Sequence, residues 1–249
     1  MDLPPEFDAY KYGSFAVNAG EQIWRLTRQI DSQLTALAEP GGVRGLPPIL
    51  AFQSVADATV SAPAVVDAFY ERLAPEGHAL VMFDANRLTS TRPLLKQGLF
   101  SVRGHLLKEA LLPFDLTVVS NAAENGPAVA AWHRAPNSTR IERTPTDLVW
   151  PPGVFSLSHV ALPIAPDDPL YGATPPAKNG TGVYLGRLSL LGEKGQLTVP
   201  ETLLMRLRYN PFFPYLTRRL DDFLRPLPVP AGQSGTNEGR SGQNKSPAH

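Results

Sequence analysis

Two short apolar runs, Ile49-Leu-Ala-Phe52 and Ala79-Leu-Val-Met-Phe83, stand on either side of a segment that begins at Ser61 and Pro63. Continuous apolar runs of this length are typical of parallel strands that are covered on both faces. The segment between them carries apolar residues at helical spacing, namely Val65, Val66, Phe69, Tyr70 and Leu73. The sequence therefore predicts a right-handed strand–helix–strand unit over residues 49–83, which is the basic unit of an α/β fold.

Two further elements extend this unit. From Asn18 to Leu37 apolar residues recur every three or four positions, which predicts an amphipathic helix that ends before Pro40. The β-branched run from Leu116 to Ser120 predicts a third strand. Together these segments predict a mostly parallel sheet with flanking helices.

The remaining segments give weaker patterns. Glycines interrupt residues 94–112, so short helices are expected there, and the polar, proline-containing residues 136–152 are expected to form a loop. Residues 183–190 and 197–199 resemble the two arms of a hairpin, and helices are predicted over 201–208 and 215–224. Residues 226–249 are rich in Pro, Gly, Ser, Asn and Gln, and we expect this tail to be disordered. The expected organisation is one domain over residues 1–225 followed by the tail.

Composition excludes several classes of function. The chain has 249 residues with 23 basic and 23 acidic side chains, and no basic stripe that could bind a nucleic-acid backbone. It has no cysteine, which excludes a disulfide scaffold or a thiolate nucleophile. No run reaches the ~18 apolar residues of a membrane span, and no leader pattern is present. We expect a cytoplasmic protein with no cofactor, no nucleic-acid partner and no integral membrane segment.

Asp57 and His159 are the residues that point to chemistry. Asp57 follows the predicted strand at 49–52, and His159 lies in the run Val154-Phe-Ser-Leu-Ser-His159-Val-Ala-Leu-Pro163. A strand-end acid followed much later by a histidine matches the chain order of the last two members of an α/β-hydrolase triad. In such a site the carboxylate orients the imidazole, which acts as a general base. The simpler interpretations are a loop-capping acid and an interior histidine.

Five runs of the sequence resemble a bacterial group of lysophospholipase-like α/β hydrolases, which is related to the serine aminopeptidase and monoglyceride lipase families. The runs are Tyr12-Gly-Ser-Phe-Ala-Val-Asn18, Phe52-Gln-Ser-Val-Ala-Asp-Ala-Thr-Val-Ser61, Leu80-Val-Met-Phe-Asp-Ala-Asn-Arg87, Phe155-Ser-Leu-Ser-His-Val-Ala-Leu-Pro163 and Asp167-Asp-Pro-Leu-Tyr-Gly172. The resemblance extends over residues 10–224. It implies a partial α/β-hydrolase fold, with Asp57 and His159 as triad acid and histidine and an apolar ester or lipid-like small molecule as substrate.

The nucleophile of such a triad has no counterpart, because the sequence contains no Gly-x-Ser-x-Gly. Ser54 lies at the end of a strand but lacks the two glycines of a nucleophile elbow, and Ser14 follows no strand and is expected in a turn. Ser156 and Ser158 flank the histidine and are better placed to position it. We therefore expect a C-terminal portion of a serine hydrolase that is inactive alone, or a catalytically silent binding or structural remnant of that fold.

Three further expectations remain. Asp84, at the end of the second strand, is the rival acid, although Arg87 nearby could hold it in an ion pair. Asp167 and Asp168 lack the ligand spacing of a metal site, so none is predicted. A parallel sheet without its central strands would expose an apolar edge, which favours self-association or pairing with another chain.

Overall fold

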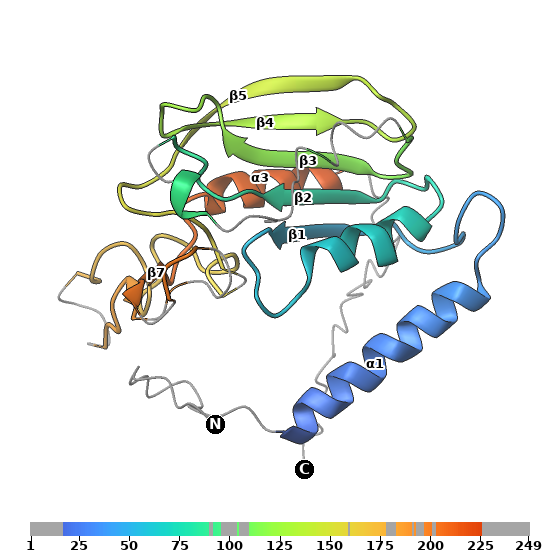
Figure 1. The fold of residues 1–249 in the computed structure, drawn as a ribbon, viewed down its shortest axis with the longest axis horizontal. Coiled ribbons are helices and arrows are strands. Elements are labelled where there is room, and N and C mark those ends of the chain that lie inside the picture. Colours follow the sequence, from blue (N-terminus) through green and yellow to red (C-terminus); the bar gives the residue numbers. More distant parts are fainter. Residues whose placement is uncertain are drawn as a thin grey trace, which may run out of the picture.

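A five-stranded mixed sheet forms the centre of the protein (Figure 1). The computed structural model describes residues 17–89, 92–95, 104, 110–158, 160–177, 183–190, 192, 197–200 and 203–225. The strands are ordered β1-β2-β3-β4-β5, and their bounds are Leu50–Ser54, Ala79–Phe83, Asp115–Asn121, Ala128–Arg134 and Ile141–Val149. The α/β class is therefore confirmed. The expectation of a mostly parallel sheet is wrong. The β1–β2 and β2–β3 pairs are parallel, whereas the β3–β4 and β4–β5 pairs are antiparallel.

The strand–helix–strand unit predicted from the two apolar runs is confirmed. Between β1 and β2 the chain forms a continuous helical segment that includes the π-helical stretch η1 (Ala64–Phe69) and the 3-10 turn η2 (Tyr70–Arg72). The two strands pair in parallel, with Leu50 opposite Ala79 and Ser54 opposite Phe83. The third predicted strand is also present, as β3.

Strand β2 is buried along its whole length because helices cover both faces of the sheet. Its residues alternate between two apolar clusters. Leu80 and Met82 pack with Val66 and Tyr70 of η1 and η2, on one face of the sheet. Val81 and Phe83 pack on the other face, in a cluster that includes residues of helix α3 (Phe213–Leu224), which Figure 1 shows behind the strands.

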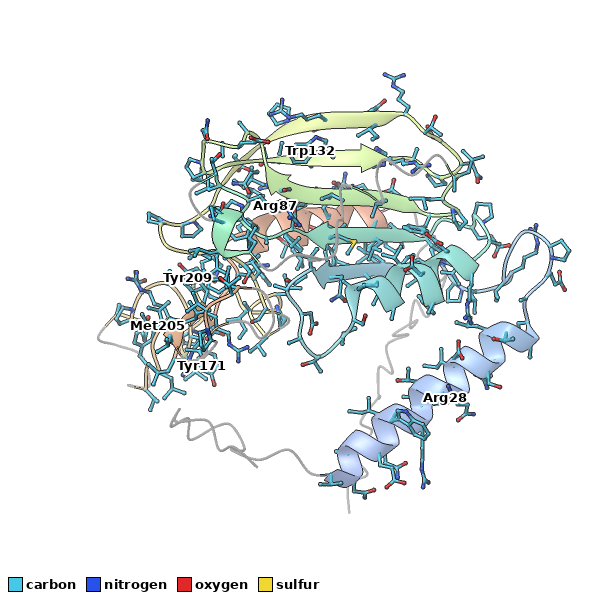
Figure 2. All side chains as sticks on the ribbon, in the orientation of Figure 1. Arg28, Arg87, Trp132, Tyr171, Met205 and Tyr209 are labelled. Carbon is cyan, nitrogen blue, oxygen red and sulfur yellow. The ribbon has the colours of Figure 1, made fainter. Side chains whose placement is uncertain are left out.

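Helix α1 (Val17–Ala36) confirms the predicted amphipathic helix, but most of its apolar side chains are exposed. Leu34 is its buried residue, and Asp31 accepts a hydrogen bond of 2.8 Å from Arg72 of η2. Figures 1 and 2 show the helix extending away from the sheet. The exposed apolar side chains of α1 are Val17, Ile23, Trp24, Leu26 and Ile30.

The loop expected over residues 136–152 is wrong, because this region contains strand β5. The prediction failed because this segment contains polar residues and Pro145, which are typical of loops. Strand β5 lies at the edge of the sheet, where most side chains are exposed and a proline is tolerated. Strand β4 was not predicted either. Its alanine-rich sequence has little β-branched character.

The hairpin expected between 183–190 and 197–199 is wrong in its second arm. Strand β6 (Leu188–Ser189) pairs instead with β7 (Arg206–Leu207), and Leu197 forms a bridge with Leu95. The pairing of β7 also contradicts the helix predicted over 201–208. Helix α3 confirms the helix predicted over 215–224.

Some predictions fall outside the described residues. These are the tail at 226–249, most of the short helices predicted within 94–112, and Ser14.

Gly42 allows two backbone segments to approach closely. Its φ is +98°, and a Cβ at this position would lie 2.6 Å from the carbonyl carbon and oxygen of Leu73. This approach lets Val43 exchange backbone hydrogen bonds with Arg72 and Ala74. Gly45 also has a positive φ, of +76°, but a Cβ there would meet no atom within 4 Å.

We predict that Gly42→Ala lowers the free energy of unfolding by about 2 kcal/mol or more, because it adds a backbone clash to left-handed strain. Gly45→Ala is the matched control and should lose about 1 kcal/mol, from strain alone. Urea denaturation measures both. Equal losses in the two variants would show that the close approach to Leu73 is not restrictive.

Candidate functional site

Polar side chains gather where the three parallel strands end. Because β1, β2 and β3 are parallel and in register, their carboxyl ends lie at the same edge of the sheet. Ser54 is the last residue of β1, Asp84 follows β2, and Ser120 and Asn121 complete β3. In open α/β sheets this edge is where ligands bind, so it is the candidate site.

Asp84 is fully buried at this edge and its carboxylate is saturated. Arg87 donates to both carboxylate oxygens, at 2.7 and 2.8 Å, and Ser120 Oγ donates to Oδ2 at 2.8 Å. The Ala85 backbone N–H donates to Oδ1 at 2.9 Å. Burial disfavours the charged guanidinium, but the hydrogen bonds and the charge of Asp84 outweigh burial and raise the pKa of Arg87. The ion pair considered from the sequence is therefore confirmed, and Asp84 is a structural group.

Two asparagines continue this network, and the sequence analysis did not identify them. Asn121 Nδ2 donates to Asn86 Oδ1 at 2.8 Å, and Asn121 Oδ1 accepts the Arg87 backbone N–H at 2.7 Å. Figure 2 shows Arg87 beside the central strands. Their positions could have indicated this contact from the sequence, because Asn86 and Asn121 lie at the ends of adjacent strands.

Asp57 lies three residues beyond β1 and is half-buried. Its Oδ1 accepts the backbone N–H groups of Thr59, at 2.8 Å, and Val60, at 2.9 Å. Its Oδ2 lies 3.5 Å from Gln53 Nε2. The carboxylate thus caps its own loop, as the simpler interpretation predicts, and this cap holds it at the carboxyl end of β1.

His159 is outside the described residues, but the segment that precedes it crosses the same sheet edge. Asn86 donates to two carbonyls of this segment, from Nδ2 to Val154 and from its backbone N–H to Phe155, both at 2.7 Å. Ser54 Oγ donates to the carbonyl of Leu157. Asp57 and residues 154–158 are therefore held at the same end of the sheet.

Ser54, Ser158 and Asp168, which the sequence analysis considered, form local hydrogen bonds. Ser54 Oγ also accepts the Ala56 N–H at 3.1 Å, so this hydroxyl is engaged in structure. Ser158 Oγ accepts the Ala161 N–H at 3.3 Å. Asp168 caps a turn by accepting the N–H groups of Leu170 and Tyr171, both at 2.9 Å. Within the described residues no group of three histidine, aspartate or glutamate side chains could hold a metal.

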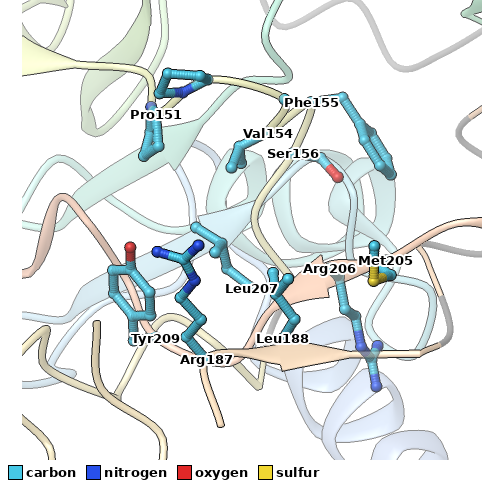
Figure 3. A pocket seen from close by; sticks show the side chains of 12 residues that line it. Pro151, Val154, Phe155, Ser156, Arg187, Leu188, Met205, Arg206, Leu207 and Tyr209 are labelled. Atoms are coloured by element: carbon cyan, nitrogen blue, oxygen red, sulfur yellow. The ribbon is translucent and has the colours of Figure 1, made fainter. Parts of the chain in front are cut away.

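A cavity of about 460 Å³ is lined on one side by the segment 151–156 (Figure 3). Its opposite wall comes from the β6–β7 pair and Tyr209. Ser156 is buried and lines the cavity, and its Oγ has no hydrogen-bond partner among the described residues. The sequence analysis did not predict this cavity, because its two walls come from segments far apart along the chain.

A histidine–aspartate pair that the sequence analysis did not consider occupies the opposite end of the sheet. His133 of β4 contacts the carboxylate of Asp115 at the start of β3, and Arg219 lies 3.6 Å from the same carboxylate. The hydrogen bond to Asp115 raises the pKa of His133 above its ordinary value of 6.5, against the effects of burial and Arg219. Because Asp115 begins β3 and Asp57 follows β1, this pair is remote from the candidate site.

Comparison with protein families, curated proteins and solved structures gives no match. Among the described residues, no helix is both long and apolar enough to cross a membrane.

We predict that Asp84→Asn lowers the free energy of unfolding by about 3 kcal/mol, because it removes the charge of a fully buried carboxylate and leaves the partly buried Arg87 without its charged partner. Asp57→Asn is the control, since the amide oxygen can still accept the two loop N–H groups, and it should lose less than about 1 kcal/mol. Urea denaturation followed by circular dichroism measures both values. Similar losses would contradict a structural role specific to Asp84.

We predict that His133→Gln is more destabilising at about pH 5.5 than at about pH 8.5. Because the pKa of His133 is raised in the folded state, protonation favours folding. This contribution is complete below pH 6.5 and is lost as the pH rises through the folded-state pKa. Subtracting the parent's stability at each pH removes the effect of groups common to both proteins, and an equal loss at the two pH values would refute the prediction.

Proposed function

We propose that this chain contributes the acid, Asp57, and the general base, His159, to a serine-hydrolase site that cleaves an apolar carboxylic ester. The nucleophilic serine would come from polypeptide outside this sequence. The observation that carries the proposal is the contact between Ser54 Oγ and the Leu157 carbonyl. It joins the strand that leads to Asp57 to the segment that leads to His159.

In the proposed reaction His159 takes the proton of the serine hydroxyl as this oxygen attacks the ester carbonyl. The imidazolium then gives the proton to the leaving alcohol, and a second cycle with water releases the acid. Asp57 accepts the other imidazole N–H and stabilises the imidazolium. Capping by Thr59 and Val60 engages Oδ1 of Asp57, so Oδ2 is the oxygen we assign to this role.

The geometry at β1 supports the part of the proposal that concerns the missing nucleophile. In the pairing with β2, Ile49 and Val55 use their backbone groups, so the groups of Leu50 and Phe52 face the edge of β1 that no described strand covers. An edge of this kind pairs with another strand. A parallel strand added here would end beside Asp57, where a nucleophile is required.

The second candidate function is a catalytically silent binding or structural remnant of the same fold. The loop cap at Asp57 favours it, because the hydrogen bonds from Thr59 and Val60 give this carboxylate a structural role in its own loop. The two functions differ in whether Asp57 acts on the imidazole of His159.

We predict that Asp57→Asn shifts the titration of the His159 imidazole to lower pH, because removing a nearby negative charge disfavours the protonated ring. Nuclear magnetic resonance of the ring nitrogens measures this in the full chain. Asp168→Asn is the matched control, since it alters a carboxylate that caps a turn in the same way, and it should leave His159 unchanged. Identical titration in parent and Asp57→Asn would favour the silent remnant.

The same preparation tests the nucleophile. Loss of the triad serine costs on the order of 10⁶ in turnover in a measured serine protease, so the chain should neither hydrolyse p-nitrophenyl esters nor react with a fluorophosphonate probe. Stoichiometric labelling would overturn the external nucleophile, and the labelled serine would identify the internal one.

A further inference from the structure

Among the described residues, the lining of the cavity between residues 151–156 and the β6–β7 pair includes cationic and polar side chains and no carboxylate. Its polar side chains are Arg187, Arg206, Ser156 and Tyr209. The volume of about 460 Å³ lies within the range of small-molecule sites. A cavity with only positive charge attracts an anion.

Arg187 is the cation directed at the ligand space. Arg187 directly precedes β6, and Figure 3 shows its guanidinium directed toward Pro151 and Val154, beside the hydroxyl of Tyr209, whereas Arg206 points away. Within the described part of the chain, the Arg187 side chain has no carboxylate or carbonyl partner, and neither does the Tyr209 hydroxyl. A guanidinium with free donors binds a phosphate or carboxylate through two parallel hydrogen bonds.

Ser156 adds an independent indication of a ligand. Its residue is only 3 % exposed, and its Oγ is buried without a hydrogen-bond partner. Figure 3 shows this oxygen directed into the cavity from the wall opposite β6 and β7. A buried hydroxyl with no partner is costly, and a polar ligand atom in the cavity would satisfy it.

The rest of the lining is apolar. Leu188 and Leu207 form the floor between Arg187 and Ser156, and Val154 and Phe155 form the facing wall. Inorganic phosphate alone would leave these surfaces uncovered, whereas an alkyl chain would cover them. We propose that this cavity binds an anionic amphiphile, with a phosphate or carboxylate head group on Arg187 and Tyr209 and an apolar chain along Leu188 and Leu207.

This site does not depend on the proposed triad, because Asp57 does not line the cavity and the contacts proposed for the ligand use neither Asp57 nor His159. Its failure and the failure of the catalytic proposal are therefore separate results. The shared chemistry of the ligand is an anionic oxygen group joined to an apolar chain.

Isothermal titration calorimetry of the full chain tests the proposal with three probes: decyl phosphate below its micelle concentration, inorganic phosphate, and decyl glucoside, which has the same chain and no charge. We expect decyl phosphate to bind once per chain. The other two probes should bind at least about tenfold more weakly, because each lacks one half of the recognised chemistry.

Three variants test the head-group contact. Arg187→Gln should weaken decyl phosphate binding about tenfold or more, and it should fold normally because Arg187 is exposed and unpartnered. Arg206→Gln is the matched control in the neighbouring strand and should retain the parent affinity within about twofold. Arg187→Lys should bind between the parent and Arg187→Gln, since it keeps the charge and loses the bidentate geometry.

Three outcomes would overturn the proposal. Equal binding of decyl phosphate and decyl glucoside would show that the charge is not recognised. Equal binding of inorganic phosphate would show that the apolar floor contributes nothing. Equal effects of Arg187→Gln and Arg206→Gln would show only general electrostatic attraction.

Discussion

The parallel pairing of β1, β2 and β3 is the constraint on which the rest of the structure depends. It requires a crossover between β1 and β2, which η1 and η2 provide, and it buries β2 on both faces. It also brings three strand ends to one edge. The polar residues at these ends bind one another and the segment 154–158, so the pairing that builds the core also builds the candidate site.

At that edge, burial separates two carboxylates into different roles. Asp84 is enclosed and neutralised by Arg87 and Ser120, which stabilises the turn after β2 and engages both carboxylate oxygens. Asp57 is half-buried and held by its own loop. The acid proposed for the triad, Asp57, is therefore the one that retains solvent exposure, whereas Asp84 is fully engaged in structural hydrogen bonds.

The segment 151–158 connects the carboxyl edge of the parallel strands with the cavity. Leu157 and Val154 bind the sheet edge through Ser54 and Asn86, and Ser156 faces the cavity of about 460 Å³. One extended segment thus presents its carbonyls to the sheet and a hydroxyl to the cavity. The open edge of β1 and the exposed apolar face of α1 are the other features that the described fold leaves without a covering element.

Local patterns in the sequence were sufficient to predict β1, β2, β3, α1 and α3, because apolar periodicity reflects which face of each element is buried. They also indicated the loop cap at Asp57 and the Asp84–Arg87 ion pair, since these residues follow strand ends. Tertiary structure alone determined β5, whose polar sequence is stable as a strand only through pairing with β4, and the pairing of β6 with β7. It also determined the cavity and the Asn86–Asn121 contact, because each joins residues that are distant in the chain and that only the folded sheet brings together.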